Sequence, residues 1–441
     1  MHRRIFTLPL PCAAPNSHCG VPMITLPHHC EFLSDAWIDE ATGYLRRELS
    51  RQGEGLTGQP FRISGRFVNA PPHLKQPGDV AQWTATWDGE TLASTRDFTT
   101  QADLVAEGDY QASLILAQTV GALAPGVMTG AVHELRHLHG ADAFRVSSRV
   151  TAPVVRDLIG TLHDHMARRT VENPDLAHRA RRLGLLERIR EIEANGYTVI
   201  ERAISPEFAD TLRAATLRAL LPHNTFQLQW MLYHGTEFER IVQNPLLMTL
   251  IDASLGRGAV IASLSAIRRG PGKGLIPIHT DHSLVPEPFP EWAVTGVGVW
   301  AMEDWTAASG PTWIVPGSHR LRRDPRPGEG LDKGIPIEMP KGSVVYFTHG
   351  TWHWQGDRAE PGERVTLHSH FNRGILRGLE PKKVDVQMLH RNAPRLGEML
   401  GEDDWFDKLT AEGRDHLRAR YMAQLHRFTD KRKHALLTGS D

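Results

Sequence analysis

Apolar and polar residues alternate in short helical and extended patterns over the first third of the chain. Apolar residues recur at helical spacing over residues 32–50, where Ser34 or Asp35 can cap the helix. Residues 61–68 and 82–87 alternate as strands do, and Asp88-Gly89 is typical of a hairpin turn. With further helices expected over residues 109–124 and 152–169, the pattern predicts a small α+β domain with an antiparallel sheet.

The pattern changes after residue 182. A predicted helix over residues 183–195 ends at Asn195-Gly196, a left-handed stop signal. A short strand over residues 197–200 and helices opened by Ser205-Pro206 and Asn244-Pro245 follow. The chain is then rich in strands and in Gly and Pro turns as far as about residue 377, and residues 403–433 are expected to be helical. This part therefore reads as a mainly-β domain with flanking helices.

A polar, arginine-rich stretch over residues 170–182 separates the two patterns, and we place the domain boundary there. The sequence then divides into a loose tail (1–30), an accessory domain (31–175) and a larger domain (183–441). The basic run Arg179-Ala180-Arg181-Arg182 is interpreted as a solvated helix face.

Composition narrows the functional classes. The 441 residues carry a formal net charge of −1, which does not favour a nucleic acid or a charged membrane surface as partner. No apolar run is long enough for a membrane span, and no clear signal peptide precedes Met23, which is an alternative start to Met1; we expect a cytoplasmic protein. The three cysteines, Cys12, Cys19 and Cys30, lie in the tail, so the body is expected to have neither a disulfide nor a thiolate metal site. The oligomeric state is not predicted.

The motif with the clearest chemistry is His279-Thr280-Asp281. In an extended segment, residues two apart point to the same face, so His279 and Asp281 can meet one ion. His353 follows the predicted strand 343–347 and is the third candidate ligand. Two histidines and one carboxylate on one face of a metal are typical of non-haem Fe(II) oxygenases. Arg364, eleven residues after His353, can bind the distal carboxylate of a co-substrate.

Several segments from Ile189 to about Arg377 resemble the phytanoyl-CoA dioxygenase family of Fe(II)/2-oxoglutarate oxygenases. They are residues 193–200, His279-Thr280-Asp281, the run 310–320 that ends in Pro-Gly-Ser-His-Arg, His353, and Arg364 at the expected offset. The resemblance implies a double-stranded β-helix, or jelly roll. It also implies that His279, Asp281 and His353 bind Fe(II), and that Arg364 binds 2-oxoglutarate.

The resemblance further implies an oxidoreductase that uses dioxygen and releases succinate and CO2. Halogenases of the superfamily have a small residue in place of the carboxylate, so Asp281 favours hydroxylation. Gln355 and Trp300 are further candidate contacts of the co-substrate or its pocket, and Trp305, Trp352 and Trp354 are candidate pocket residues. His368 and His370 share strand parity with Arg364, so at least one is expected to contact the 2-oxoglutarate or substrate pocket, with His368 assigned to cofactor binding.

Some ligand assignments have rivals in the sequence. His282 and His349 are the alternatives to His279 and His353, and they fit strand parity and the offset to Arg364 less well. His319, in the Pro-Gly-Ser-His-Arg run, is expected to fix a loop.

Residues 31–140 resemble, by their order of elements alone, the sterol carrier protein-like fold, which encloses an apolar tunnel for lipid. An unrelated accessory domain explains the same pattern. A lipid-binding domain would favour a small, hydrophobic substrate. Two alternative functions stay open: a lipid-binding or transport protein with a degenerate barrel, and a metal-dependent barrel enzyme that does not use 2-oxoglutarate.

Overall fold

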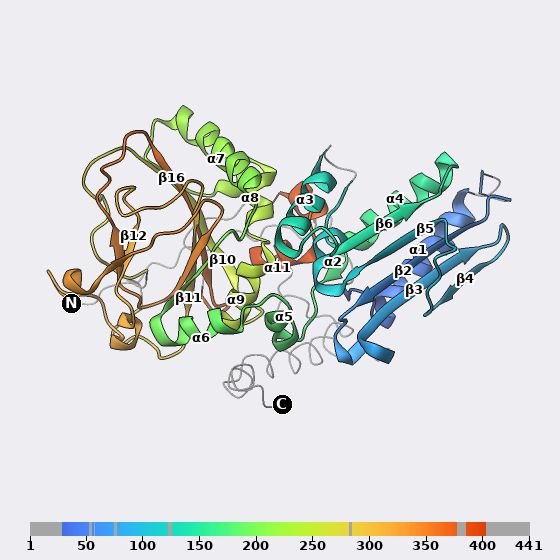
Figure 1. Cartoon of the computed structure of the whole chain (residues 1–441), viewed down its shortest axis with the longest axis horizontal. Helices are drawn as coiled ribbons and strands as arrows, with labels where there is room; N and C mark the ends of the chain where they lie inside the picture. Colours follow the sequence, from blue (N-terminus) through green and yellow to red (C-terminus); the bar gives the residue numbers. More distant parts are fainter. Residues whose placement is uncertain are drawn as a thin grey trace, which may run out of the picture.

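The computed structural model describes residues 29–52, 55–56, 58–74, 77–121, 126–281, 285–376 and 385–402. It places a five-stranded sheet at one end of an elongated molecule and a six-stranded sheet at the other, with helices between them (Figure 1). The predicted helix over residues 403–433 and the cysteines Cys12 and Cys19 lie outside the described residues. None of the described helices combines the length and the apolar character that crossing a membrane requires.

The N-terminal sheet has the strand order β4-β3-β2-β5-β6, and all neighbours are antiparallel except β2 and β5. Its strands are β2 (Phe61–Val68), β3 (Val80–Trp87), β4 (Leu92–Thr95), β5 (Leu104–Asp109) and β6 (Phe144–Ser148). The helices of this part are α1 (Asp35–Gln52), α2 (Tyr110–Ala117), α3 (Val127–His139) and α4 (Pro153–Ala167), with short 3-10 turns at Pro72–Leu74 and Pro77–Asp79. The predicted helix over residues 109–124 is thus shorter than expected, and α3 was not expected at all.

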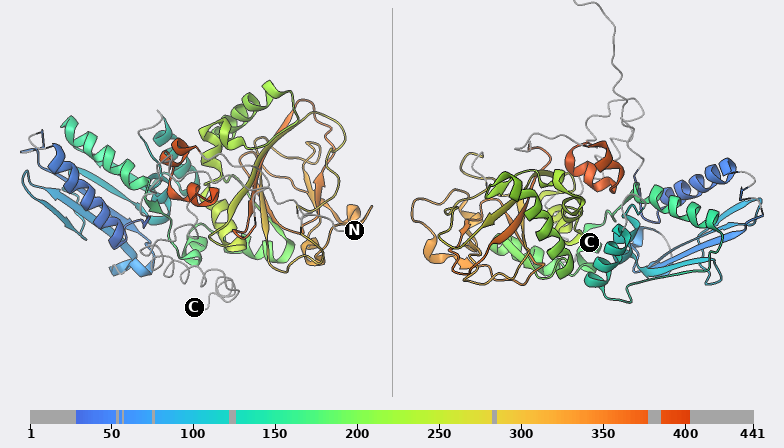
Figure 2. Two further views of the ribbon diagram at one scale, coloured as in Figure 1. Left: turned by 180° about the vertical axis from the view of Figure 1, so that it is seen from behind. Right: turned by 90° about the horizontal axis from the view of Figure 1, so that it is seen from above.

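Helices α1 and α4 lie side by side on one face of this sheet (Figure 2). The space between them and the strands is filled by a buried aromatic core. Trp37 meets the rings of Phe32 and Trp83 edge to face, with centroids 5.5 Å apart in both pairs. Phe67 and Tyr110 complete the cluster around Phe32. This packing does not support the apolar lipid tunnel that the sterol carrier resemblance implies.

The C-terminal part contains a six-stranded antiparallel sheet of order β8-β14-β11-β16-β10-β9 and a three-stranded sheet of order β13-β12-β15. The first consists of β8 (Tyr197–Ile200), β9 (Gln227–Leu228), β10 (Val260–Arg269), β11 (Thr295–Ala301), β14 (Val344–Thr348) and β16 (Arg364–Asn372). The second consists of β12 (Thr312–Ile314), β13 (Ile335–Pro336) and β15 (His353–Gln355). Short 3-10 turns occupy Leu221–His223, Met231–His234, Ser318–Leu321 and Leu331–Lys333.

The two faces of the six-stranded sheet have different coverings. The outer face, which carries Leu264, Trp300 and Leu367, packs on helices through a large apolar core. These helices are α6 (Leu186–Asn195), α7 (Pro206–Leu220), α8 (Thr236–Ile241) and α9 (Pro245–Leu255). The inner face, which carries Val297 and Phe347, packs on Ile314 of the three-stranded sheet. The space beside this inner face is where the candidate ligands lie.

The predicted C-terminal end of helix α6 is confirmed at Gly196. Its φ is 85°, and its N–H donates to the Ile192 carbonyl at 2.8 Å. A Cβ at this position would lie 2.6 Å from side-chain atoms of His319 and Thr351. Gly196 is therefore required both by the left-handed conformation and by the close approach of the loop that carries His319.

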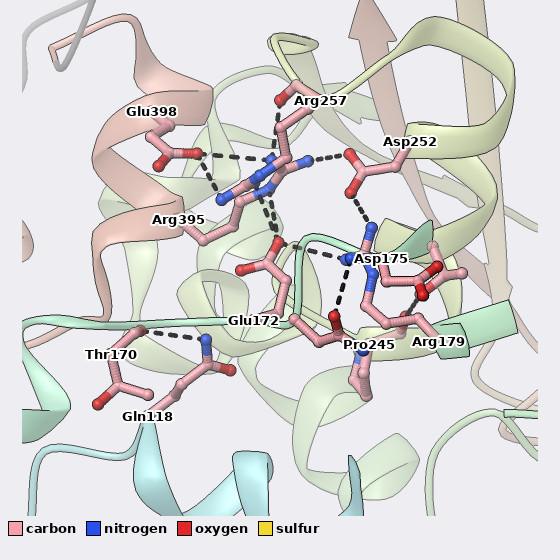
Figure 3. Close-up of polar contacts among 12 residues, drawn as sticks. Gln118, Thr170, Glu172, Asp175, Arg179, Pro245, Asp252, Arg257, Arg395 and Glu398 are labelled. Carbon is pink, nitrogen blue, oxygen red and sulfur yellow. Dashed lines mark hydrogen bonds and ion pairs between the residues drawn. The ribbon is translucent and has the colours of Figure 1, made fainter. Parts of the chain in front are cut away.

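A buried cluster of ion pairs joins the two parts of the molecule (Figure 3). Asp252 of α9 accepts bonds from Arg179 of α5 (Leu176–Arg182) and from Arg395 of α11 (Pro394–Leu400), both at 2.6 Å. Glu172 and Arg257 pair at 3.0 Å, and Arg257 also pairs with Glu398; short α10 (Val386–His390) precedes α11. We call these six residues, Glu172, Arg179, Asp252, Arg257, Arg395 and Glu398, the junction cluster.

The junction cluster corrects one expectation. Arg179 was expected on a solvated helix face, but it is only 4% exposed. Its burial is stabilised by carboxylates that lie far away in sequence. The stretch around the expected domain boundary is likewise ordered: Thr170–Val171 forms strand β7, which pairs in parallel with β1 (Cys30–Glu31).

A second contact joins α3 to α7. The buried Ser205 caps α7 by accepting the N–H of Phe208 at 3.1 Å, and its own N–H and hydroxyl donate to Glu134 of α3.

We expect Ser205→Ala to lower the free energy of unfolding by about 2 kcal/mol, because the helix loses its cap and the buried Glu134 carboxylate loses a donor. Urea denaturation followed by circular dichroism measures the change. The exposed Ser147→Ala is the control, and a loss no larger than that of this control would contradict the assignment.

Candidate metal centre

Two histidines and one aspartate converge beside the inner face. His279, Asp281 and His353 each offer a ligand atom, and the three atoms lie within 4.8 Å of one another. The Nε2 atom of His279 is 3.5 Å from Asp281 Oδ1, and that of His353 is 3.6 Å from Asp281 Oδ2. The structure therefore brings the three predicted ligands together in one group.

Hydrogen bonds to the backbone set the tautomer of both imidazoles. His279 Nδ1 lies 2.9 Å from the carbonyl oxygen of Pro277, and His353 Nδ1 lies 3.0 Å from that of Thr351. Because a carbonyl oxygen can only accept, each Nδ1 carries the hydrogen in the neutral ring. Each Nε2 then presents a lone pair to the carboxylate. Metal-binding histidines are commonly oriented in this way.

The electrostatics of the group agree with this assignment. Burial lowers the pKa of His353 to about 4, so the ring is neutral near pH 7. Although burial opposes ionisation, the neighbouring His353 and His279 hold the pKa of Asp281 well below its usual range. The buried Oδ2 of Asp281 has no hydrogen-bond partner. Two lone pairs and an unpaired anionic oxygen at one point form a donor set that fits a divalent cation.

Backbone pairing holds the ligand segments in place. His279 and His353 form a two-way bridge with both N–H···O distances at 3.0 Å, and their ring centroids are 4.2 Å apart. Thr280 points the other way and donates to Asp324. The Pro-Gly-Ser-His-Arg run supports the segment before His353, because the Ser318 hydroxyl accepts the Trp352 N–H at 2.8 Å. This run thus positions the metal-binding segment without supplying a ligand.

Arg364 is buried at the start of β16, on the inner face. Its guanidinium lies 4.7 Å from the centroid of the Trp305 ring, and one nitrogen donates to the Gly310 carbonyl. Nε is buried and has no partner. Burial and the neighbouring Arg269 lower the pKa of Arg364 to about 9, so the group remains a cation near pH 7. An unpaired donor on a buried cation fits a carboxylate ligand.

Three polar residues were predicted to contact the pocket, His368 and His370 from strand parity and Gln355 from the family resemblance. His368 and His370 alternate with the outer-face residues Leu367 and Phe371, so both point to the inner face. Their rings stack with centroids 6.2 Å apart. Gln355 shares the parity of His353 on β15, and its side-chain oxygen accepts the Leu275 N–H at 2.9 Å.

The predictions for the four tryptophans agree less well with the structure. Trp300 lies on the outer face, fully buried in the helix-covered core, and donates to Ser369, so its predicted contact with the co-substrate is wrong. Trp352 and Trp354 alternate with His353 and point away from it. Trp352 donates to the Arg323 carbonyl, and Trp354 stacks on Trp313. Of the four, Trp305 is the one that contacts a candidate site residue, Arg364.

The rival histidines lie elsewhere. His349 is buried, with Nε2 bonded to the Pro290 carbonyl at 3.0 Å, and it is not in the group of candidate ligands found among the described residues. His319 packs against Gly196 and Gly350, as expected of a loop-fixing residue. His282 lies outside the described residues.

Sequence reasoning missed a buried arginine pair beside Arg364. Arg269 is its cross-strand partner and donates to the carbonyls of Gly356 and Gly272. Arg358 donates to the carbonyls of Ser309 and Pro361. Backbone oxygens accept from the terminal nitrogens of both, whereas the buried Nε of Arg358, like that of Arg364, has no partner. Arg269 could have been recognised as a neighbour of Arg364 only from the pairing of the two residues across β10 and β16, and the sequence alone does not give that register.

Comparisons with known proteins find a family match over the segment that carries the candidate ligands. The model of the family described as phytanoyl-CoA dioxygenase (PhyH) matches residues 221–357, a range that contains His279, Asp281 and His353 and ends before Arg364. A curated relative, the dioxygenase af480 of Aspergillus fumigatus, is 27% identical over 163 residues. The aligned residues make up 36% of this chain and 52% of the relative, so the chain spans about half the length of that relative. A solved structure, HygX from Streptomyces hygroscopicus with nickel and 2-oxoglutarate bound, covers 46% of this chain and 92% of its own at 12% identity and a TM-score of 0.39. The matched segment is therefore similar to phytanoyl-CoA dioxygenases and carries all three candidate ligands.

Proposed function

We propose that this protein is an Fe(II)- and 2-oxoglutarate-dependent dioxygenase that hydroxylates a small organic substrate. The observation that carries the proposal is the convergence of two lone-pair-bearing Nε2 atoms and an unpaired carboxylate oxygen at one point. The phytanoyl-CoA dioxygenase match over the same segment supports it. We also propose that residues 183–441 form a jelly-roll oxygenase domain and that residues 31–175 form an accessory domain.

Each residue has a defined task in this proposal. His279, Asp281 and His353 hold Fe(II), and the bonds from their Nδ1 atoms to Pro277 and Thr351 keep the two imidazoles in the binding tautomer. Arg364 binds the distal carboxylate of 2-oxoglutarate with its unpaired Nε, and Trp305 fixes the guanidinium plane. When bound, iron, 2-oxoglutarate and dioxygen supply the oxidising chemistry, with succinate and CO2 as co-products.

Hydroxylation is proposed over halogenation because Asp281 supplies a carboxylate to the group. This anion occupies the place where a halide would bind the metal in halogenases with a small residue there. The buried setting of Asp281, with its pKa held low by His353 and His279, keeps it anionic and suited to a cation.

The direct test is anaerobic reconstitution of the full chain with Fe(II) and 2-oxoglutarate. The expected result is the weak visible charge-transfer band of the metal chelate, followed by succinate formation when air is admitted. Absence of the band at saturating iron would overturn the proposal. A band with iron and 2-oxoglutarate that is lost in His279→Ala with Asp281→Ala supports it.

The role of Arg364 has its own test. We expect Arg364→Ala to raise the KM for 2-oxoglutarate by about a hundredfold, because charge-assisted hydrogen bonds to a buried carboxylate are lost. Succinate formation across a range of 2-oxoglutarate concentrations measures this. The exposed Arg190→Ala is the matched control. An unchanged KM in Arg364→Ala would overturn the role given to Arg364, whereas a wild-type protein that forms no succinate from 2-oxoglutarate would favour a barrel enzyme that does not use it.

A further inference from the structure

The inner face of the six-stranded sheet is polar on one side of the candidate metal centre. In the register of β10 and β16, Ser263 pairs with His370. On the other side of β16, His370 pairs with Val297 of β11. Thr295, two residues before Val297 on β11, pairs with Asn372. Directly opposed residues of neighbouring strands share a face, so Ser263, His370 and Thr295 all face inward. We call these three residues the polar strip.

A β-bulge places Ser263 in this strip. The register shifts between Ile261, which pairs with Phe371, and Ser263, which pairs with His370, so Ala262 is the extra residue. Without the bulge, Ser263 would share the outward direction of Ile261, which is buried in the helix-covered core. Bulges next to functional sites commonly re-aim a side chain in this way. Here the bulge turns a hydroxyl toward the candidate metal centre.

The polar strip contains one buried hydroxyl without a hydrogen-bond partner. His370 is half-buried, and its ring stacks on that of His368. The buried Thr295 hydroxyl lacks a partner. The Ser263 hydroxyl donates to Gln229, an exposed residue, at 3.0 Å. Buried polar groups are normally satisfied, so the Thr295 hydroxyl indicates a place where a ligand or water binds.

The strip lies next to the candidate ligands and beside open space. Phe347, in the same row of the sheet as Val297, touches His353 with ring centroids 4.5 Å apart. His370 also interacts electrostatically with Asp281. Although His368 and His370 lie on the inner face, both keep accessible surface, as does Asp281, whose side chain is 20% exposed. An inward-facing side chain can stay accessible only where the two sheets enclose space.

The inner-face positions beside His370 and His368 on β11 and β14 are apolar and uncharged. The positions that continue the rows of His370 and His368 across the sheet are Val297, Phe347, Val299 and Val345. The cations on this face, Arg269 and Arg364, stand six positions away at the other end of the paired strands. Among the paired positions of β10, β16, β11 and β14, the candidate metal centre is thus flanked by one hydrogen-bonding wall and one apolar wall, and the arginines lie at the far end of the strands.

We infer that the substrate is an apolar carbon skeleton carrying a neutral hydrogen-bonding group, such as a hydroxyl or a carbonyl, which the polar strip binds while the apolar wall holds the carbon to be oxidised. The inference rests on the proposed function and narrows it. It revises the expectation of a simply hydrophobic substrate. It also argues against recognition of a carboxylate or phosphate at this wall, since the strip contains neither arginine nor lysine.

The test uses two sets of probes, each matched in carbon number. The full chain is loaded anaerobically with Fe(II) and 2-oxoglutarate, and the visible band is followed while probe is added. The probes are cyclododecane, cyclododecanol, cyclododecanone and dodecanoate, together with octane, 2-octanol, 2-octanone and octanoate. We expect the alcohols and ketones to perturb the band with half-saturation at least about tenfold below that of the hydrocarbons and carboxylates, since one hydrogen bond made in a dry site is worth about that factor.

Substitutions in the polar strip test whether its residues cause the preference for alcohols and ketones. His370→Leu and Ser263→Ala should reduce the alcohol preference to within about threefold, whereas His370→Gln, which keeps a donor and an acceptor, should restore most of it. Equal response to hydrocarbon and alcohol, an unchanged preference in His370→Leu, or a band that no probe perturbs would each overturn the inference. Failure of the band itself to form would instead count against the proposed function, so the two failures are distinguishable.

Discussion

Replacing Asp281 by Ala is expected to lower the affinity for Fe(II) by at least about a hundredfold and to abolish succinate formation. Loss of an outer-shell partner alone typically costs 10- to 100-fold in metal affinity, and Asp281 is a candidate ligand itself. The change also leaves the Nε2 lone pairs of His279 and His353 without the anion that opposes the metal charge. Anaerobic equilibrium dialysis measures the affinity directly, independently of turnover.

Two comparisons make this result specific. Asp357→Asn removes an exposed carboxylate that pairs with Lys273, and it should leave iron affinity unchanged. His349→Asn changes the rival histidine, which bonds to the Pro290 carbonyl, and it should also retain iron binding, whereas His353→Ala should lose it. Iron binding that survives in Asp281→Ala, or that is lost in His349→Asn with normal folding, would show that the ligand group is assigned wrongly.

Replacing Asp252 by Asn is expected to lower the free energy of unfolding by about 3–5 kcal/mol. Asp252 is 4% exposed and pairs with both Arg179 and Arg395. Removing one charge from a buried cluster leaves its partners desolvated and uncompensated, and this costs far more than the pairs add when intact. Asn keeps the volume, so the loss reports on charge. Urea denaturation followed by circular dichroism measures it.

The matched control for Asp252 is Asp210→Asn. Asp210 also pairs with a cation, Lys341, but its side chain is 62% exposed. Exposed ion pairs contribute about 0–1 kcal/mol, so this variant should remain close to the wild type. Similar losses in the two variants would mean that the junction cluster is as well hydrated as a surface pair.

Two of the three candidate ligands could be found from sequence because their signal is local. His279 and Asp281 are two residues apart in an extended segment, a spacing that alone places them on one face. His353 and Arg364 required a family pattern, because nothing local specifies that β15 lies beside residue 279. Strand parity then correctly oriented His368 and His370 relative to Arg364, since β16 runs without a bulge along β11.

Other features depend on contacts that no local pattern encodes. Trp300 was misplaced because the sequence does not say which face of β11 turns to the helices, and residues of both parities on this strand are apolar. The bulge at Ala262 shifts the parity of β10 without any Gly or Pro to mark it. The burial of Arg179 depends on Asp252, 73 residues away, so a basic run that resembles a solvated face became part of the interior.

The junction cluster bears on how this protein can be divided into fragments. A cut inside residues 175–183, where composition suggests a linker, would leave Glu172 on the N-terminal fragment and Arg179 next to the new end or on the other fragment. Asp252 and Arg395 would stay with the C-terminal fragment, so each piece would carry charges whose partners had left. Fragments cut there would tend to associate again or to aggregate. A C-terminal fragment that begins ahead of Thr170 keeps all six members of the cluster together and is the sounder choice for dissecting the protein.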